Sequence, residues 1–243
     1  MTQNPTIPNP ITVTILPAQP PDYHPIAALE AQTFYHEPFT IVAFGPLRGT
    51  PKVVSVRGEG LAKQPTDKEG NRKKGEWNLV TKAVDENGII VGAAAWGFVT
   101  SGEGQEVGEV EVEGRKEVGE EVTGGDWPEG ANVKFCEEFF GKGDRLMAES
   151  CKGKDYAKLS VLVVSPSYQR RGIGAKILEH GLKEVDKLGL QCVLGASKEG
   201  LGLYTKFGFE KYETIPIKLW EYEGGEGFGS DEQVIMNRPA RKV

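Results

Sequence analysis

Residues 163–174 read Val-Val-Ser-Pro-Ser-Tyr-Gln-Arg-Arg-Gly-Ile-Gly, and this stretch decides the fold. It begins in the most β-like run of the chain, residues 159–164, which Pro166 ends. Apolar residues then recur at helical spacing over 172–188, which predicts an amphipathic helix. The sequence therefore predicts a buried strand that leads through a basic, glycine-containing loop into a helix.

The loop at 169–174 has the features of a phosphate site. The first turn of a helix leaves backbone N–H groups unpaired and carries the positive end of the helix dipole. Glycine lets a phosphate approach the backbone closely, and Arg170, Arg171 and Lys176 can add charge-assisted hydrogen bonds. The loop has neither the GK[ST] ending of a P-loop nor the third glycine of a dinucleotide fingerprint. From these residues alone, an anion-binding loop and an ordinary helix start with exposed arginines both stay open.

The composition indicates a folded protein with one acidic segment. The 243 residues are 38% hydrophobic, which suits one domain with insertions or at most two small domains. The net charge of −6 gives the whole chain no electrostatic attraction to nucleic acids or acidic membranes, so we expect neither as a partner. Twelve acidic and three basic residues lie in 101–138, so this segment carries −9 and the remainder +3. The acidic segment could attract a cationic acceptor, or it could be a solvated loop.

Cysteine usage and the apolar pattern bear on metal binding and location. The three cysteines, Cys136, Cys151 and Cys192, form no CxxC pair, so we expect neither a disulfide framework nor a zinc site, and no metal ion. The N-terminus lacks the charged and apolar regions of a secretory signal, and no apolar run approaches the length of a membrane span. We therefore expect a soluble cytoplasmic protein, and a nuclear location is also compatible.

Strands and helices alternate along the rest of the chain. We expect strands at 11–15, 77–85, 89–99, 190–194, 209–214 and 217–222, and helices over 22–36, 131–150 and 198–207. Asn87-Gly88 predicts a two-residue hairpin turn, because both residues tolerate positive φ. This order predicts an α/β (α+β) architecture, a mixed central sheet with helices on both sides.

The weakest patterns, at about 38–76 and 101–130, are interpreted as loop insertions. A short helix around 53–63 stays open although Gly58 and Gly60 weaken it, and a hairpin stays open within 101–130. The expected organisation is a disordered tail over 1–10, a single domain over 11–223, and a C-terminal loop and tail over 224–243 with room for a last short strand.

Two stretches resemble the GNAT family, the GCN5-related N-acetyltransferases. Gln-Arg-Arg-Gly-Ile-Gly after Val-Val-Ser-Pro is similar to the coenzyme A motif of that family. Ala196-Ser197 after a strand, followed by Leu-Tyr-Thr-Lys-Phe-Gly-Phe-Glu at 203–210, resembles its second half. The likeness is strong over 157–213, and the extra helix before the coenzyme-binding strand resembles that of some fungal or bacterial members. It implies the acyl-CoA N-acyltransferase fold, with acetyl-CoA as the acyl donor.

The resemblance also implies which residues hold the donor. In the family, the backbone of the central strand pairs with the pantetheine arm, a splay or bulge there makes room for the thioester, and the loop amides hold the pyrophosphate. The implied cofactor-binding residues are Leu162, Val163, Val164, Gln169, Arg170, Arg171, Gly172, Ile173, Gly174, Ala175, Lys176, Ser197 and Tyr204. The Val164 N–H would contact the oxyanion, and Tyr204 would be the general acid that protonates the thiolate. Tyr204 could instead be a core tyrosine whose hydroxyl has a backbone partner.

The residues that bind the acceptor are harder to predict from the sequence than those that bind the donor. We expect an amine to attack the thioester directly in a ternary complex, with a small-molecule amine or a peptide as acceptor. His36 and Trp96 are candidate substrate contacts, and a core role is open for Trp96. No general base stands out among the acidic candidates Glu37, Glu149 and Asp155. Two other functions stay open, a non-catalytic acyl-CoA-binding module and a nucleotide-binding protein of another fold.

Overall fold

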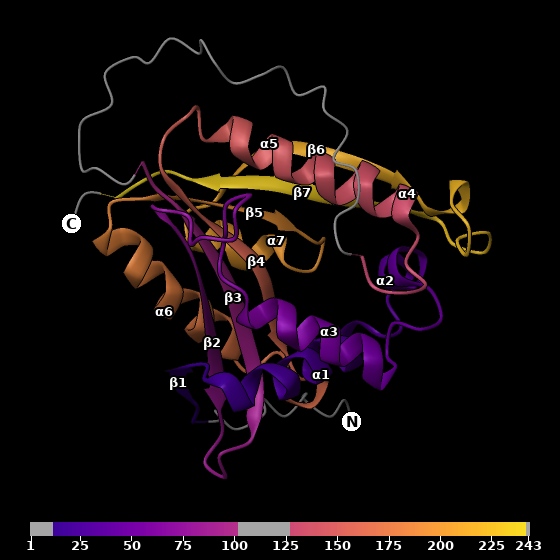
Figure 1. Cartoon of the computed structure of the whole chain (residues 1–243), viewed down its shortest axis with the longest axis horizontal. Helices are drawn as coiled ribbons and strands as arrows, with labels where there is room; N and C mark the ends of the chain where they lie inside the picture. The colour runs from indigo at the N-terminus through magenta and orange to yellow at the C-terminus, as the bar shows by residue number, and fades with distance from the viewer. Residues whose placement is uncertain (1–11, 102–126, 242–243) are drawn as a thin grey trace, which may run out of the picture.

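The computed structural model describes residues 12–101 and 127–241, which form a mixed sheet in the order β1-β2-β3-β4-β5-β7-β6 (Figure 1). Only the β4–β5 pair is parallel among these neighbours. The strands are β1 (Thr14–Pro17), β2 (Glu76–Val84), β3 (Ile90–Val99), β4 (Tyr156–Val164), β5 (Gln191–Ala196), β6 (Glu210–Lys218) and β7 (Ser230–Arg238). This arrangement confirms the predicted mixed α/β sheet.

Helices cover both faces of the sheet because side chains alternate between the faces along each strand. Cys192 and Leu194 of β5 pack into the cluster that contains α6 (Ile173–Lys187) and α7 (Leu201–Lys206). Val193 packs on the opposite face, against α4 (Val133–Cys136) and α5 (Lys142–Ser150). On β3 and β4, Ala93 and Val163 face α1 (Tyr23–Phe34) and α3 (Pro51–Ala62). The sheet therefore has a layer of helices on each of its two faces.

Residues 38–62 are not the loop insertion that we expected. They form α2 (Pro38–Phe44) and α3, each with a proline at its first position, where proline suits a helix. Gly58 weakens the helical pattern in the sequence, but a Cβ at this position would lie 3.2 Å from the His24 Cα. The glycine therefore allows α1 and α3 to pack closely, and the open helix at 53–63 is confirmed.

The C-terminal part of the domain was predicted only in part. The two closing strands expected at 209–214 and 217–222 are one strand, β6, followed by a short 3₁₀ turn. The last strand that stayed open within 224–243 is present as β7, which lies between β5 and β6. The domain thus extends past residue 223, and its last strand is an interior one.

Two local predictions differ in detail from the structure. The Asp85 N–H bonds to the Ile89 carbonyl at 3.0 Å, so the β2–β3 loop contains three residues, 86–88, instead of two. The predicted helix at 131–150 is present, and a π-helical turn (Glu137–Gly141) joins α4 to α5. The tail at 1–10 and most of the acidic insertion lie outside the described residues. Within the described parts, no helix is long and apolar enough to cross a bilayer.

Candidate functional site

The sheet opens between β4 and β5. The two strands pair only from Tyr156 to Leu159, so residues 160–164 have β3 as their one strand neighbour in the sheet. At the same place the register with β3 shifts, so that Ser160 is an extra residue opposite Ala95 and Trp96. The structure thus has both the splay and the bulge that the resemblance implies.

The backbone of Val164 faces this opening. The Ser165 N–H donates to the Val91 carbonyl at 2.9 Å, on the β3 side. Successive residues of a strand direct their backbone groups to opposite edges, so the Val164 N–H and carbonyl point away from β3. The Gln169 side chain donates to that carbonyl at 3.0 Å, and the N–H stays available for an oxyanion.

The loop after β4 ends in a row of unpaired amides. The first helical hydrogen bond of α6 runs from the Lys176 N–H to the Gly172 carbonyl at 3.1 Å. Among the described residues, the N–H groups of residues 170–175 have no acceptor. Gly172 has φ +80, and Arg170 has φ +60, a conformation that costs a non-glycine residue about 1 kcal/mol. The loop therefore holds a strained conformation and leaves several successive N–H groups without a partner among the described residues.

The start of α6 lies against β4 and α7. A Cβ at Gly174 would sit 3.7 Å from Val164 Cγ2 and 3.8 Å from Leu203 Cδ2. The opened edge of β4 (160–164), the free amides (170–175) and α7 thus adjoin one another. We call this region the β4 groove.

An aspartate on the neighbouring hairpin anchors the loop that borders the β4 groove. The Tyr168 hydroxyl donates to Asp85 Oδ2 at 3.0 Å, and Asp85 Oδ1 accepts from the N–H groups of Ile89 and Asn87 at 2.9 and 3.0 Å. The Ile89 N–H, with these other donors, lowers the pKa of Asp85. The stabilisation from this lowered pKa is present above the unfolded value near 3.8 and is lost as the pH falls through the folded value.

We expect Asp85→Ala to weaken anion binding at the loop, because Tyr168 loses its partner and residues 165–172 gain freedom. The measurement is the affinity for coenzyme A by calorimetry, together with the melting temperature as a function of pH. Asp67→Ala is the matched control, because Asp67 also accepts two turn N–H groups, from Glu69 and Asn71, but contacts no tyrosine. Equal affinities for coenzyme A in the two variants would contradict this role of Asp85.

Tyr204 lies on α7, beside the groove. Its half-buried ring packs edge-on against Phe209, with 5.8 Å between the ring centroids, in the cluster that also contains Cys192. Burial raises the pKa of its hydroxyl to about 12, and the neighbouring Cys192 contributes. Among the described residues the hydroxyl has no hydrogen-bond partner, so the backbone partner of the core interpretation is not there. The hydroxyl stays protonated at neutral pH and can donate.

Residues 129–211 match the family model described as "Acetyltransferase (GNAT) domain". The chain carries a GNAT domain. The matched residues include β4, α6, β5 and α7, and therefore every element that borders the β4 groove. A comparison with curated proteins finds no match.

Solved structures of acetyltransferases share the fold over almost the whole chain. A histone acetyltransferase HPA2-related protein from Corynebacterium glutamicum is 18% identical, with a TM-score of 0.57, and the match covers 96% of this chain and 99% of that one. Arylalkylamine N-acetyltransferase 2 from Aedes aegypti is 15% identical, with a TM-score of 0.62 and coverages of 95% and 100%. A mosquito arylalkylamine N-acetyltransferase-like 5b is 14% identical, with a TM-score of 0.58, and the match covers 93% of this chain and 99% of that one. The GNAT fold thus extends beyond the matched segment.

Other residues predicted to lie in the site of this GNAT domain are dispersed. Trp96 is 1% exposed and packs over Gly181 of α6, so its side chain belongs to the core, the role that the sequence left open for it. The strand parity around the bulge turns this side chain to the α6 face. His36 is exposed in the turn between α1 and α2, beside the Tyr35 ring. Ser197 is exposed directly after β5.

The candidate general bases do not gather at the groove. Asp155 accepts a hydrogen bond from the Ser101 N–H at 2.9 Å, which gives it a structural role. Glu37 and Glu149 are exposed, at the start of α2 and the end of α5. Within the described residues no group of three or more His, Cys, Asp or Glu side chains could hold a metal ion.

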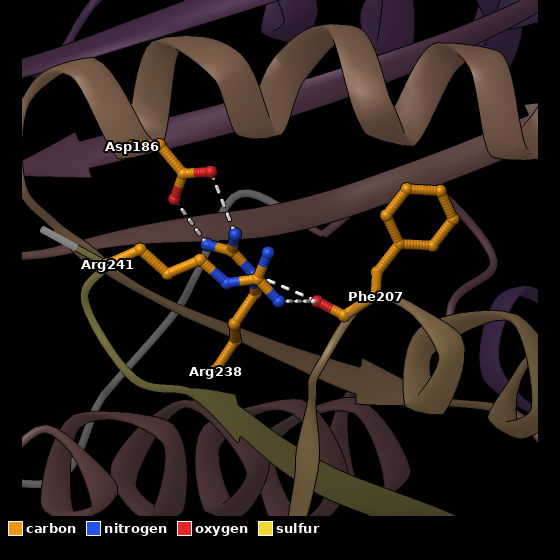
Figure 2. A network of polar contacts seen from close by, with 4 residues as sticks. All are labelled: Asp186, Phe207, Arg238 and Arg241. Carbon is orange, nitrogen blue, oxygen red and sulfur yellow. Dashed lines mark hydrogen bonds and ion pairs between the residues drawn. The ribbon is translucent and has the colours of Figure 1, made fainter. Parts of the chain in front are cut away.

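Sequence reasoning missed a buried ion pair that fixes the end of α7 (Figure 2). Arg238 of β7 is 2% exposed and bonds to both carboxylate oxygens of Asp186 on α6, at 2.6 and 2.8 Å. Its Nε donates to the Phe207 carbonyl at 3.0 Å, and Arg241 donates to the same oxygen at 3.2 Å. This contact ties α6, α7 and β7 together, and no motif in the sequence indicates it.

The sequence reasoning also missed a pocket of about 110 Å³ at the bulge. It lies beneath α3 and includes Arg57, Asn78 and Ser160 in its lining. We call it the bulge pocket. The proline at the start of α3 and the apolar spacing of Val53, Val54 and Leu61 are the signals that could have found its helical wall.

Proposed function

We propose that this chain is an acyl-CoA-dependent N-acetyltransferase that transfers acetyl from acetyl-CoA to a primary amine by direct attack in a ternary complex. One observation carries the proposal. The opened edge of β4, the unpaired amides at the start of α6 and the helix that carries Tyr204 adjoin one another, with Gly174 in van der Waals range of Val164 and Leu203.

The residues of the β4 groove fit coenzyme A. Six consecutive N–H groups and the positive end of the 15-residue helix α6 suit a pyrophosphate. A Cβ at Gly172 would meet no atom within 4 Å, so the loop leaves open space there. Arg170 and Lys176 are exposed, with no ion-pair partner in the described parts of the chain, and can contact phosphate oxygens. The opened β4 edge offers backbone groups to the amides of a pantetheine arm.

The thioester provides an activated carbonyl, and the chain must orient it and compensate the charges that develop. Proximity of amine and carbonyl in one complex accounts for a large part of such rate accelerations. The Val164 N–H would stabilise the oxyanion. The Tyr204 hydroxyl would donate to the departing sulfur.

The non-catalytic acyl-CoA-binding module remains as the second candidate. It is favoured by the position of Asp155, the one partly buried acidic candidate, whose carboxylate is bound by Ser101. The GNAT fold excludes the third possibility, a nucleotide-binding protein of another fold. A screen of acetyl-CoA consumption over amines, amino acids, polyamines and peptides separates the first two candidates.

We expect coenzyme A to raise the melting temperature of the protein, and we expect ATP and NAD not to raise it. We also expect Gly174→Asp to lower the affinity for coenzyme A at least about 10-fold, because the variant places a carboxylate beside the pyrophosphate. An aspartate in the first turn of a helix is favourable for the helix, and the melting temperature of the variant without ligand shows whether it is folded. Gly227→Asp is the control, at an open position in the β6–β7 loop. An unchanged affinity in Gly174→Asp would reject the proposed pyrophosphate site.

A further inference from the structure

The bulge pocket opens at the point where β4 leaves β5. Ser160, the extra residue of the bulge, contributes to its lining together with Ala95 and Trp96. If the proposed function holds, the thioester lies along the same stretch of β4. The bulge pocket is then where an acceptor reaches the carbonyl from the α3 side of the sheet.

The side chain that distinguishes the bulge pocket is Arg57 of α3. Its Nε donates to Glu30 Oε2 on α1 at 3.0 Å, and the side chains of Arg57 and Glu30 are 40% and 20% exposed. In the parts of the chain that the structure describes, the two terminal nitrogens of Arg57 have no partner. A guanidinium is planar and always charged, and its terminal N–H groups match the two oxygens of a carboxylate. Glu30 thus holds Arg57 in place and leaves its carboxylate-binding edge free.

The sheet side of the bulge pocket carries neutral acceptors. The Asn78 Nδ2 donates to the Lys63 carbonyl at 3.0 Å, which leaves its Oδ1 as an acceptor, and the Ser160 residue is exposed. The nearest other charge on β4, Lys158, is paired with Asp144 at 2.6 Å. The pocket therefore presents one free cationic edge on the helix and uncharged hydrogen-bond acceptors on the sheet.

We infer that the acceptor is a free amino acid whose carboxylate is bound by Arg57. This inference rests on the proposed function and narrows its substrate class. A pocket of about 110 Å³ is far below the roughly 300–1,000 Å³ of sites for drug-sized ligands, so the occupant is small. In the reaction the amine nitrogen bonds to the acetyl carbon, and the C–S bond breaks. The amine loses one proton and the thiolate gains one, which yields an N-acetyl amino acid and coenzyme A.

The test compares pairs of small acceptors that differ by one carboxylate, alanine with ethylamine and serine with ethanolamine. In the wild type, kcat/KM should be about 10- to 100-fold higher for the amino acid of each pair. Arg57→Gln should remove this preference by lowering kcat/KM for the amino acids alone. Glu30→Gln is the companion variant, because it keeps the guanidinium but removes the carboxylate that positions it, so it should reduce the preference less than Arg57→Gln does. In parallel, calorimetry measures the binding of each amino acid to the complex of the protein with coenzyme A.

The two proposals fail in different ways. Equal turnover of both members of each pair, or an equal loss for both in Arg57→Gln, would reject the carboxylate site and leave the acetyltransferase function standing. Binding of an amino acid that Arg57→Gln abolishes, without turnover of any acceptor, would support the site and reject the catalytic function. If the protein neither bound nor turned over any amino acid, this inference would be rejected.

Discussion

Tyr204→Phe is expected to lower kcat for acetyl transfer by about 10²- to 10⁴-fold, the usual contribution of a positioned general acid. The ring contact with Phe209 stays, so folding and the KM for acetyl-CoA should change little. Because burial raises the pKa of Tyr204 to about 12, the hydroxyl is protonated at neutral pH. The wild-type rate should therefore show no alkaline decline from this group until the pH approaches that value.

The measurement is steady-state kinetics with the best acceptor over a range of pH. Tyr212→Phe is the matched control, because Tyr212 lies 45% exposed on β6 and packs outside the core. A kcat in Tyr204→Phe equal to that of the wild type at every pH would mean that Tyr204 is a packing residue and that sulfur receives its proton from water.

Arg238→Met is expected to lower the free energy of unfolding by about 3–5 kcal/mol, the usual loss when one partner of a buried ion pair is removed. Asp186 would keep its charge, 25% exposed, without the two hydrogen bonds that now satisfy it. The Phe207 carbonyl would lose the Nε donor at the end of α7. Urea unfolding, followed by fluorescence and by circular dichroism, gives the free energy.

Arg241→Met is the control for this stability prediction. Arg241 donates to the same Phe207 carbonyl but is exposed, so its loss should change the free energy of unfolding by no more than about 0.5 kcal/mol. Similar losses in the Arg238 and Arg241 variants would show that the carbonyl contact matters and the pair with Asp186 does not. The double variant Arg238→Met, Asp186→Leu should recover part of the stability, since no buried charge is then left unpaired.

The central part of the fold could be predicted because its signals are local. The β-branched run before Pro166 and the helical spacing from Ile173 onward each depend on neighbouring residues alone. The position of β7 could not be predicted, because which strands pair depends on residues far apart in the sequence. Gly58 misled for a related reason. It lowers helix propensity but allows a close contact with α1, and that contact is invisible in the local pattern.

The candidate site shows the same difference between local signals, which could be predicted, and contacts between distant residues, which could not. The residues of the β4 groove lie within one continuous motif and are brought together as expected, although their roles stay predictions. The sequence left two roles open for Trp96 because one extra residue at Ser160 sets which face each side chain of the neighbouring strands occupies. Arg57 was not proposed because its relevance depends on α3, in a segment interpreted as a loop, and on the contact with Glu30.

The interior position of β7 has a consequence for the growing chain. Every residue of the β4 groove and of the bulge pocket is made before Ser230, the first residue of β7. Until β7 is made, β6 has no strand to pair with and β5 has an open edge on that side. A chain that stops before Ser230 would carry the complete set of binding residues with two unpaired strand edges, which promote aggregation. During synthesis, acyl-CoA binding should therefore appear late, when β7 pairs with β5 and β6.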